Sequence, residues 1–434
     1  MAKVCIIGAG SSGIAACQVL NARGIDFDCF EKGSAVGGNW RYENDNGMSS
    51  AYASLFINTS RRMMAYATYP MPADYPDYPH HTQIAAYFDD YVDHFGFRDR
   101  IRFNAEVARV APVEGGWLVN LSDGTSEVYD SVMVANGHHW NPKYPDPPFP
   151  GQDTFIGHAI HAHHYREPDE HIVDRSVLVL GIGNSATDIA VETSRHSRMT
   201  YLAMRRGAYV IPKYIGGTPT DELSSDAASR VPLPIARRVM ARKLKSVQGD
   251  MQDYGLPKPD HQLFEAHPTV SSELLPRLGH GRIAVRPNLE RIDGPTVRFV
   301  DGTSEEIDTI VWCTGYRITF PFLGAEVVET AGNRVSLFQR VVHPDRPGLY
   351  FIGLVQPLGA IMPIAELQSE WVADVIEGHA ALPAPTEMRE AIREEEERMR
   401  RRYVASTRHT IQVDFYPYMR ALKRERRRGR RQPA

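Results

Sequence analysis

Residues 3–13 read KVCIIGAGSSG, an apolar run that leads straight into a glycine-rich turn. A short continuous apolar run of this kind is typical of a buried parallel strand. The next residues, IAACQVLNARG, favour a helix that ends at Gly24, and a second strand over 25–30 leads to Glu31. The stretch therefore predicts a strand–helix–strand unit that begins close to residue 3.

The glycines of this turn have the spacing of a dinucleotide-binding fingerprint. Gly8 permits the tight turn, Gly10 lets the backbone approach a pyrophosphate, and Gly13 lets helix and strand pack closely. The helix N-terminus then faces the phosphates, and Glu31 is spaced to accept hydrogen bonds from ribose hydroxyls. We predict dinucleotide binding here, the alternative being a glycine-rich turn in an unrelated α/β fold.

A second fingerprint follows the apolar run SVLVL at 176–180. GIGNSA places Gly181 and Gly183 in the first two glycine positions, and Asn184 and Ser185 at the start of the next helix. Ala186 occupies the third position, which tolerates alanine. We predict a second dinucleotide site at this turn.

Two arginines, Arg205 and Arg206, follow the strand predicted over 199–204, where the first unit has an acid. Arginine at this place suits a 2′-phosphate, which favours NADPH over NADH. The alternative is a pair of surface arginines.

A longer repeat supports two related units. LSDGTSEVYDSVMVANGHH (121–139) aligns with FVDGTSEEIDTIVWCTGYR (299–317), and each copy predicts a hairpin at DG followed by a buried strand. The expected fold is α/β, with two Rossmann-like domains and the second inserted in the first. Two dinucleotides in one chain imply electron transfer, most simply from a nicotinamide to a flavin.

Composition excludes several other classes of protein. The chain has 434 residues and a net charge of -4, which argues against a nucleic-acid binder. Its four cysteines show no CxxC spacing and resemble small buried hydrophobes in a reducing compartment. No apolar run approaches the roughly 18–20 residues of a membrane span, and no signal peptide is recognisable. We expect a cytoplasmic protein.

Four histidines gather in FIGHAIHAHHYREPDE (155–170): His158, His161, His163 and His164. Their spacing does not place ligands cleanly on one helix face, and no cysteine is nearby, so we predict no metal site. The stretch resembles the FxGxxxHxxxY/F-R/K-P/D fingerprint of the flavin-containing monooxygenase family, among the class B flavoprotein monooxygenases. His161 is the family histidine, and Glu167 departs from the last position. We expect the other three histidines to lie in a solvated linker.

Further segments, over roughly residues 1–380, are similar to this family. GGNWRY (37–42) resembles its GGxW motif beside the flavin, which implicates Gly38 and Trp40. LFINTSRRMMAY (55–66) resembles the segment that carries an asparagine over the flavin ring, here Asn58, and GLVQPLG (353–359) resembles a segment with Gln356 near that ring.

The resemblance implies FAD and NADPH as cofactors, with O2 and a small molecule as substrates. NADPH would reduce FAD, a C4a-hydroperoxyflavin would form, and a soft nucleophile such as an amine or thioether would be oxygenated. Asn58 would orient the hydroperoxide or the NADP+ that guards it, the alternative being an asparagine in a turn.

Three other functions remain open. Baeyer–Villiger oxygenation of ketones uses the same cofactors, although Tyr165 stands where dedicated enzymes have tryptophan. A second alternative is a flavin reductase with two nucleotide sites, which the absence of a CxxC motif disfavours. A third is a protein without enzymatic activity that binds a partner in a nucleotide-dependent way.

The predicted domains are an FAD-binding domain in two parts, 1–165 and 311–395, an inserted NADPH-binding domain, 166–310, and a charged helix with a basic tail, 396–434. The tail, ALKRERRRGRRQPA (421–434), is expected to be irregular and solvated. Weak contact of this tail with a membrane surface and a homodimer are left open, and no specific nucleic-acid partner is expected.

Overall fold

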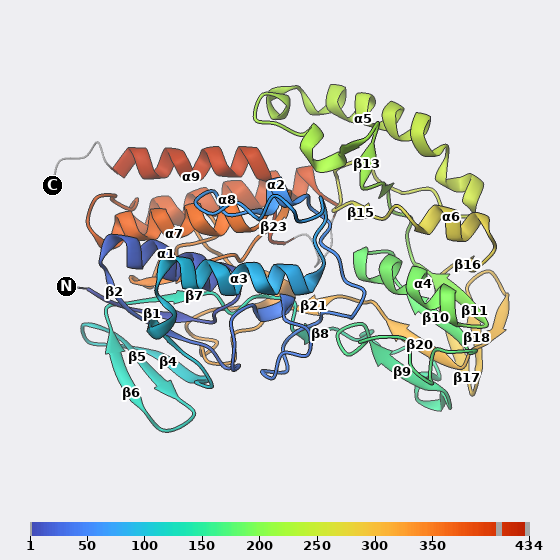
Figure 1. Cartoon of the computed structure of the whole chain (residues 1–434), viewed down its shortest axis with the longest axis horizontal. Coiled ribbons are helices and arrows are strands. Elements are labelled where there is room, and N and C mark those ends of the chain that lie inside the picture. Colours follow the sequence, from blue (N-terminus) through green and yellow to red (C-terminus); the bar gives the residue numbers. More distant parts are fainter. Residues whose placement is uncertain (1, 405–409, 430–434) are drawn as a thin grey trace. The chain divides into compact units, whose positions relative to one another are not determined.

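The chain forms two compact units in the computed structural model, which describes residues 2–404 and 410–429 (Figure 1). Unit 1 comprises Met1–Ser49, Thr59–Asn141 and Arg317–Ala434. Unit 2 comprises Ser50–Asn58 and Pro142–Tyr316, so most of unit 2 is inserted between two parts of unit 1.

Unit 1 is built on a sheet of five parallel strands with β1 at its centre. In sheet order these strands are β22 (Leu349–Phe351), β7 (Ser131–Val134), β1 (Lys3–Ile7), β2 (Asp26–Phe30) and β3 (Ile101–Arg102). Helix α1 (Ser11–Arg23) follows β1 and packs against α7 (Met362–Ile376) and α3 (His81–Phe95). The strand–helix–strand unit predicted from residues 3–31 is therefore confirmed.

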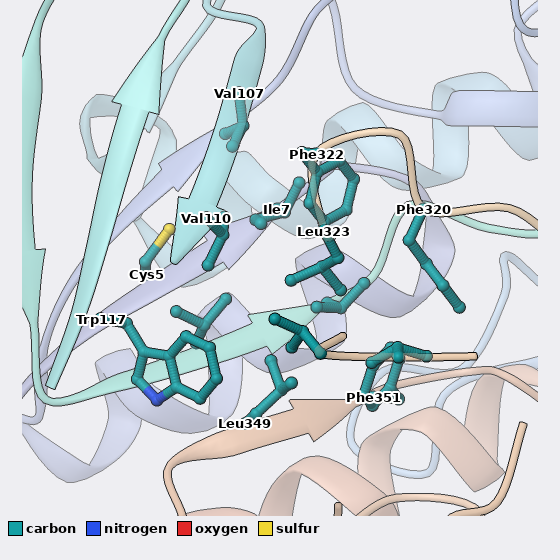
Figure 2. Close-up of a cluster of buried hydrophobic side chains, with 14 of the residues drawn as sticks. Cys5, Ile7, Val107, Val110, Trp117, Phe320, Phe322, Leu323, Leu349 and Phe351 are labelled. Atoms are coloured by element: carbon teal, nitrogen blue, oxygen red, sulfur yellow. The ribbon is translucent and has the colours of Figure 1, made fainter. Parts of the chain in front are cut away.

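A three-stranded antiparallel sheet covers part of this core, in the order β4 (Val107–Val113), β5 (Gly116–Leu121) and β6 (Ser126–Tyr129). Figure 2 shows Val107, Val110 and Trp117 of this sheet gathered with Cys5 and Ile7 of β1. Side chains of the returning chain complete the cluster: Phe320, Phe322, Leu323, Leu349 and Phe351. These side chains are almost wholly removed from water, so the hydrophobic effect stabilises the packing around β1, the strand that leads into the glycine turn.

Unit 2 repeats this plan with β10 at the centre of five parallel strands. In sheet order they are β16 (Ile283–Arg286), β11 (Met199–Ala203), β10 (Ser176–Leu180), β20 (Thr309–Trp312) and β9 (His158–His161). Helix α4 (Asn184–His196) follows β10, and β17 (Leu289–Asp293), β18 (Thr296–Phe299) and β19 (Ser304–Glu306) form the antiparallel sheet. The repeated sequence thus gives β7 and β20, the strands beside β1 and β10.

Unit 2 contains further short strands and two helices between β11 and β16. Strand β12 (Val210–Ile211) pairs in parallel with β15 (Thr269–Val270), and β13 (Tyr214–Ile215) pairs with β14 (Thr218–Pro219). Helices α5 (Leu233–Gln248) and α6 (Leu274–Gly279) complete this part. Helix α5 exposes both basic and apolar side chains: Ile235, Arg238, Val239, Arg242, Lys243 and Lys245.

The units have different bounds from the predicted domains. The chain enters unit 2 at residue 142 rather than 166, because β9 pairs with β20 at the edge of the second sheet. It leaves at 316 rather than 310, because β20 and the turn after it complete that sheet. Residues 50–58 also belong to unit 2, and no pattern in the sequence predicts this.

The C-terminal region belongs to unit 1 and forms no separate domain. Helix α8 (Pro385–Arg402) precedes β24 (Gln412–Asp414), which pairs with β23 (Gln356–Leu358), and α9 (Phe415–Gly429) packs on α7. The expectation of an irregular tail is wrong for 421–429, which lie in α9, where Phe415, Tyr418 and Leu422 form a buried stripe. Residues 430–434 lie outside the described part. Within that part, no helix combines the length and apolar character needed to cross a membrane.

Candidate dinucleotide sites

The first glycine turn is built so tightly that two of its positions exclude any side chain. Gly8 has φ +95°, and a Cβ on it would lie 2.9 Å from the Ala135 carbonyl oxygen. A Cβ on Gly13 would lie 1.8 Å from the Gly8 carbonyl oxygen. Glycine is therefore required at both positions, as the fingerprint predicts.

Gly10 faces a second glycine loop. The 3₁₀ turn Gly38–Trp40 lies against it, because a Cβ on Gly38, which has φ +53°, would approach Gly10 Cα to 3.0 Å. The Gly37 N–H donates to the Ala9 carbonyl oxygen at 3.0 Å. The structure thus brings Gly38 and the turn of partly exposed Trp40 to the fingerprint, and their position beside a flavin stays a prediction.

The N-terminus of α1 has the character of an anion site. Its N-cap is Gly10, no side chain caps it, and its first turn contains no acidic residue. The leading N–H groups of a helix carry partial positive charge, so this end suits a pyrophosphate. Together with the backbone cradle of Gly10 and Gly38, it fits the diphosphate of a dinucleotide.

Glu31 is buried at the end of β2, with 3% of its surface exposed. Its carboxylate accepts hydrogen bonds from Ala9 N at 2.7 Å, Gly33 N at 2.8 Å and Asn46 Nδ2 at 3.1 Å. The acid therefore holds the fingerprint turn as well as standing where a ribose is expected. Asn46 was missed by the sequence analysis, since no motif marks it.

The returning chain completes unit 1 with another close glycine. A Cβ on Gly353 would lie 1.9 Å from Ser12 Oγ in the first turn of α1, and the Gly353 N–H donates to Gln368 Oε1 at 2.8 Å. Gln356 begins β23 three residues later, and its N–H donates to the Ile411 carbonyl oxygen. The segment predicted to return to the flavin thus meets the start of α1, and the position of Gln356 relative to a flavin ring stays a prediction.

The second glycine turn follows the same design. Gly181 has φ +140°, and a Cβ on it would lie 2.7 Å from the Cys313 carbonyl oxygen. Gly183 is the N-cap of α4, which has no capping side chain and no acid in its first turn, where Ser185 is partly exposed. This end also fits a phosphate group.

Asn184 has a structural partner that the sequence did not reveal. Its Oδ1 accepts from Val270 N at 2.9 Å, and the neighbouring Thr269 hydroxyl donates to the Ile182 carbonyl oxygen. Strand β15 therefore holds the second glycine turn in place. No spacing rule connects residues so far apart in the chain.

Arg205 and Arg206 are both exposed just beyond the carboxyl end of β11. Arg206 Nε lies 3.3 Å from a carboxylate oxygen of Asp260, whereas Arg205 has no ion pair within the described residues. Arg205 is thus the more available cation for a 2′-phosphate.

Asn58 ends the segment of unit 2 that precedes Thr59. Its Oδ1 is shielded from solvent and has no hydrogen-bond partner among residues 2–404 and 410–429. Buried polar atoms without partners are uncommon and often belong to sites that bind a ligand. This orphaned acceptor fits the predicted role of Asn58 toward a bound cofactor.

Two of the four clustered histidines, His161 and His163, are buried in unit 2, whereas His158 is partly exposed and His164 is exposed. His161 is fully buried between the rings of Tyr144 and Tyr316, at centroid distances of 5.3 Å and 5.5 Å, and its Nδ1 accepts from His163 N at 3.0 Å. Burial lowers the pKa of His161 to about 4, so the ring is neutral. The expected solvated linker is wrong for His163, which is buried and contacts the Tyr316 ring.

In the part of the chain that the structure describes, one three-ligand cluster has a spacing that suits a metal: Asp374, Glu377 and His379. Arg23 binds both carboxylates, at 2.7 Å to Asp374 and 2.8 Å to Glu377. Arg426 Nε lies 2.7 Å from the other oxygen of Asp374. These two guanidinium groups already neutralise the acids, so an ion network explains the cluster.

Two parallel sheets, each with a glycine turn and an uncapped helix at the carboxyl end of its central strand, define a protein with two candidate dinucleotide sites. Residues 1–426 match the model of the flavin-binding monooxygenase-like family, described as FMO-like. The chain belongs to this family, the flavin-containing monooxygenases, which use FAD and NADPH.

Relatives are similar in sequence to this protein over nearly its whole length. Flavin-containing monooxygenase 5 of Oryctolagus cuniculus is 37% identical over 96% of this chain and 81% of its own length. Dimethylaniline monooxygenase (N-oxide-forming) 2 of Rattus norvegicus is 33% identical over 98% of this chain and 82% of its own. Among solved structures, S-allyl-L-cysteine S-oxygenase from Allium sativum has a TM-score of 0.74 and 27% identity, over 98% of this chain and 88% of that one.

Proposed function

We propose that this monooxygenase oxygenates soft nucleophiles, converting amines to N-oxides and thioethers to sulfoxides, with FAD in unit 1 and NADPH in unit 2. The observation that supports oxygenation by a bound cofactor is the shielded, unpartnered Oδ1 of Asn58, which offers a hydrogen-bond acceptor to that cofactor. Two relatives whose names state N-oxide formation and S-oxygenation support the same substrate class.

The reaction balances as substrate, O2, NADPH and H+ giving the oxygenated substrate, NADP+ and water. FAD, when bound and reduced, supplies the chemistry that activates O2. One oxygen atom forms the new bond to nitrogen or sulfur, and the other leaves as water. No protein nucleophile is needed, because the substrate itself is the nucleophile.

The residues of the chain bind and orient the cofactors. Gly10, Gly38 and the N-terminus of α1 would hold the FAD diphosphate, with Glu31 beside the ribose. Gly183 and the N-terminus of α4 would hold the NADPH diphosphate, with Arg205 on the 2′-phosphate. Asn58 would accept a hydrogen bond and keep the reacting groups aligned; misalignment releases hydrogen peroxide instead of product.

A competition assay tests the substrate class. The FAD-loaded enzyme is given NADPH, O2 and equal amounts of methyl p-tolyl sulfide, N,N-dimethylaniline and cyclohexanone, and products and peroxide are compared with NADPH consumed. Sulfoxide and N-oxide should dominate. Lactone as the main product would replace the proposal with Baeyer–Villiger oxygenation, and peroxide alone would indicate a flavin reductase.

A further inference from the structure

Asn58 lies in unit 2 beside a partly buried polar cluster that the predicted cofactor contacts do not use. The cluster consists of Tyr52, Asp188 and Lys213, which come from the segment 50–58, from α4 and from the chain after β12. All three residues lie within one compact unit.

Lys213 is bonded to the residue next to Asn58. Its Nζ donates a hydrogen bond to the Ile57 carbonyl oxygen at 3.1 Å and lies 5.9 Å from the centroid of the Phe56 ring. Ile57 is fully buried, so this carbonyl has little access to water. A charged donor on a buried backbone carbonyl is among the stronger hydrogen bonds of a protein.

Asp188 is an acid near enough to attract the Lys213 ammonium group electrostatically. It lies in α4 one turn beyond Asn184, and its Oδ2 accepts from the Tyr52 hydroxyl at 2.6 Å. Burial lowers the pKa of Lys213, and attraction to Asp188 and Glu273 opposes that change. An ammonium group at this depth needs a nearby acid, because burying an unpaired charge is costly.

The rest of the segment is fixed to the same unit. Ala53 N donates to the Arg166 carbonyl oxygen at 2.8 Å, and the Tyr52 ring packs edge-on to Tyr165 at 6.3 Å. The segment is therefore tied at Tyr52 and Ala53 and again at Ile57. Lys213 holds the second tie, one peptide bond before Asn58.

We propose that Lys213 is a positioning residue for Asn58: by binding the Ile57 carbonyl, and supported by Asp188 and Tyr52, it sets the direction of the Asn58 side chain during oxygenation. This inference rests on the proposed function, because it needs Asn58 to act on the reaction. It also ties the orientation of Asn58 to α4, the helix whose N-terminus would receive the NADPH diphosphate.

The test uses the FAD-loaded full chain and counts hydrogen peroxide formed per NADPH oxidised. Lys213→Met keeps the length of the side chain and removes the ammonium group, so the peroxide-to-product ratio should rise about tenfold, the effect of losing one charged hydrogen bond. The NADPH Michaelis constant should change less than twofold. Lys213→Arg should restore most of the coupling, and Lys245→Met, on exposed α5, should behave as wild type.

A double-mutant cycle separates positioning from a general loss of structure. If Lys213 acts through Asn58, the double variant Asn58→Ala/Lys213→Met should form no more hydrogen peroxide per NADPH than Asn58→Ala alone. Two results would overturn the positioning role while leaving the proposed function intact: additive effects of the two substitutions on peroxide formation, or a Lys213→Met enzyme whose peroxide-to-product ratio equals that of wild type. If Asn58→Ala alone stays coupled, the role of Asn58 fails, and the positioning role fails with it.

A milder variant covers the case in which Lys213→Met does not fold. Tyr52→Phe removes only the hydroxyl that binds Asp188, and it should give a smaller rise in peroxide that again disappears in the Asn58→Ala background. A rise that persists in that background would contradict the proposal.

Discussion

The backbone N–H of Ala9 donates a hydrogen bond to the Glu31 carboxylate across 2.7 Å, joining the turn after β1 to the end of β2. The two residues follow neighbouring strands of a parallel sheet, so the hydrogen bond joins the carboxyl ends of β1 and β2 at the fingerprint turn. Glu31 therefore has two tasks, one toward its own backbone and one toward the ribose.

Glu31→Gln should weaken FAD binding by tenfold or more. The amide keeps the size of the side chain but replaces one acceptor oxygen with a donor that faces other donors, leaving buried N–H groups unsatisfied at about 1–3 kcal/mol. The bound flavin per protein after gel filtration measures the effect. Glu106→Gln, at a half-exposed ion pair with Lys32, should retain full occupancy. Equal occupancy in both variants would contradict this assignment.

Two glycine variants should separate folding from cofactor binding. A Cβ on Gly10 would lie 3.6 Å from Gly38 Cα, an ordinary contact, whereas a Cβ on Gly13 would collide with the Gly8 carbonyl. We expect Gly10→Ala to fold with a nearly unchanged melting temperature when free of FAD, but to lose most FAD affinity because the methyl group occupies the phosphate approach. Gly13→Ala should lose several degrees of thermal stability as well. A Gly10→Ala enzyme that retains FAD would place the diphosphate elsewhere.

The parts of this fold that were predictable from sequence are those set by local pattern. The strand–turn–helix segments at Gly8 and Gly181 follow from short apolar runs and glycine spacing, and the structure confirms them together with the DG hairpins. Helix α9 was missed because its basic residues dominate its composition, while its burial depends on a surface of α7 that is distant in sequence.

The candidate site divides in the same way. The glycines and Glu31 were found because they belong to contiguous motifs. Asn46, Lys213 and Thr269 were missed because each acts through long-range contacts that carry no spacing signal. The buried position of His163 was also out of reach, since only the packing of β9 and Tyr316 encloses it.

His161 should make the enzyme less stable in weak acid. Burial lowers its pKa to about 4, below the ordinary 6.5, so between these values the unfolded chain binds more protons than the folded one. Its stabilising contribution is therefore complete above pH 6.5 and is lost as the pH falls toward 4, at roughly 1.4 kcal/mol per pKa unit.

Urea unfolding midpoints from pH 5 to 8 measure this dependence. His161→Asn keeps an acceptor near the position of Nδ1 for His163 N and cannot titrate, so its midpoint should fall less on acidification than that of wild type. The exposed His280→Asn serves as the matched control and should follow wild type. Identical slopes for His161→Asn and wild type would show that His161 does not remain neutral.

Arg205 should determine the preference for NADPH, and Arg206 should matter less. Both are exposed beyond β11, but Arg206 is paired with Asp260 at 3.3 Å, whereas Arg205 is free of ion pairs in the described part of the chain. A guanidinium–phosphate contact contributes about 1.5–3 kcal/mol, so Arg205→Ala should raise the NADPH Michaelis constant roughly 10- to 100-fold. Turnover at saturation should change much less, because the 2′-phosphate contact is the same before and during hydride transfer.

The Michaelis constant for NADH, which lacks this phosphate, should not change, and the exposed Arg242→Ala on α5 should leave both constants as in wild type. Steady-state kinetics with the two nucleotides therefore decide the assignment: a loss of turnover as large as the rise in the NADPH constant, or an equal effect on NADH, would show that Arg205 does not bind the 2′-phosphate.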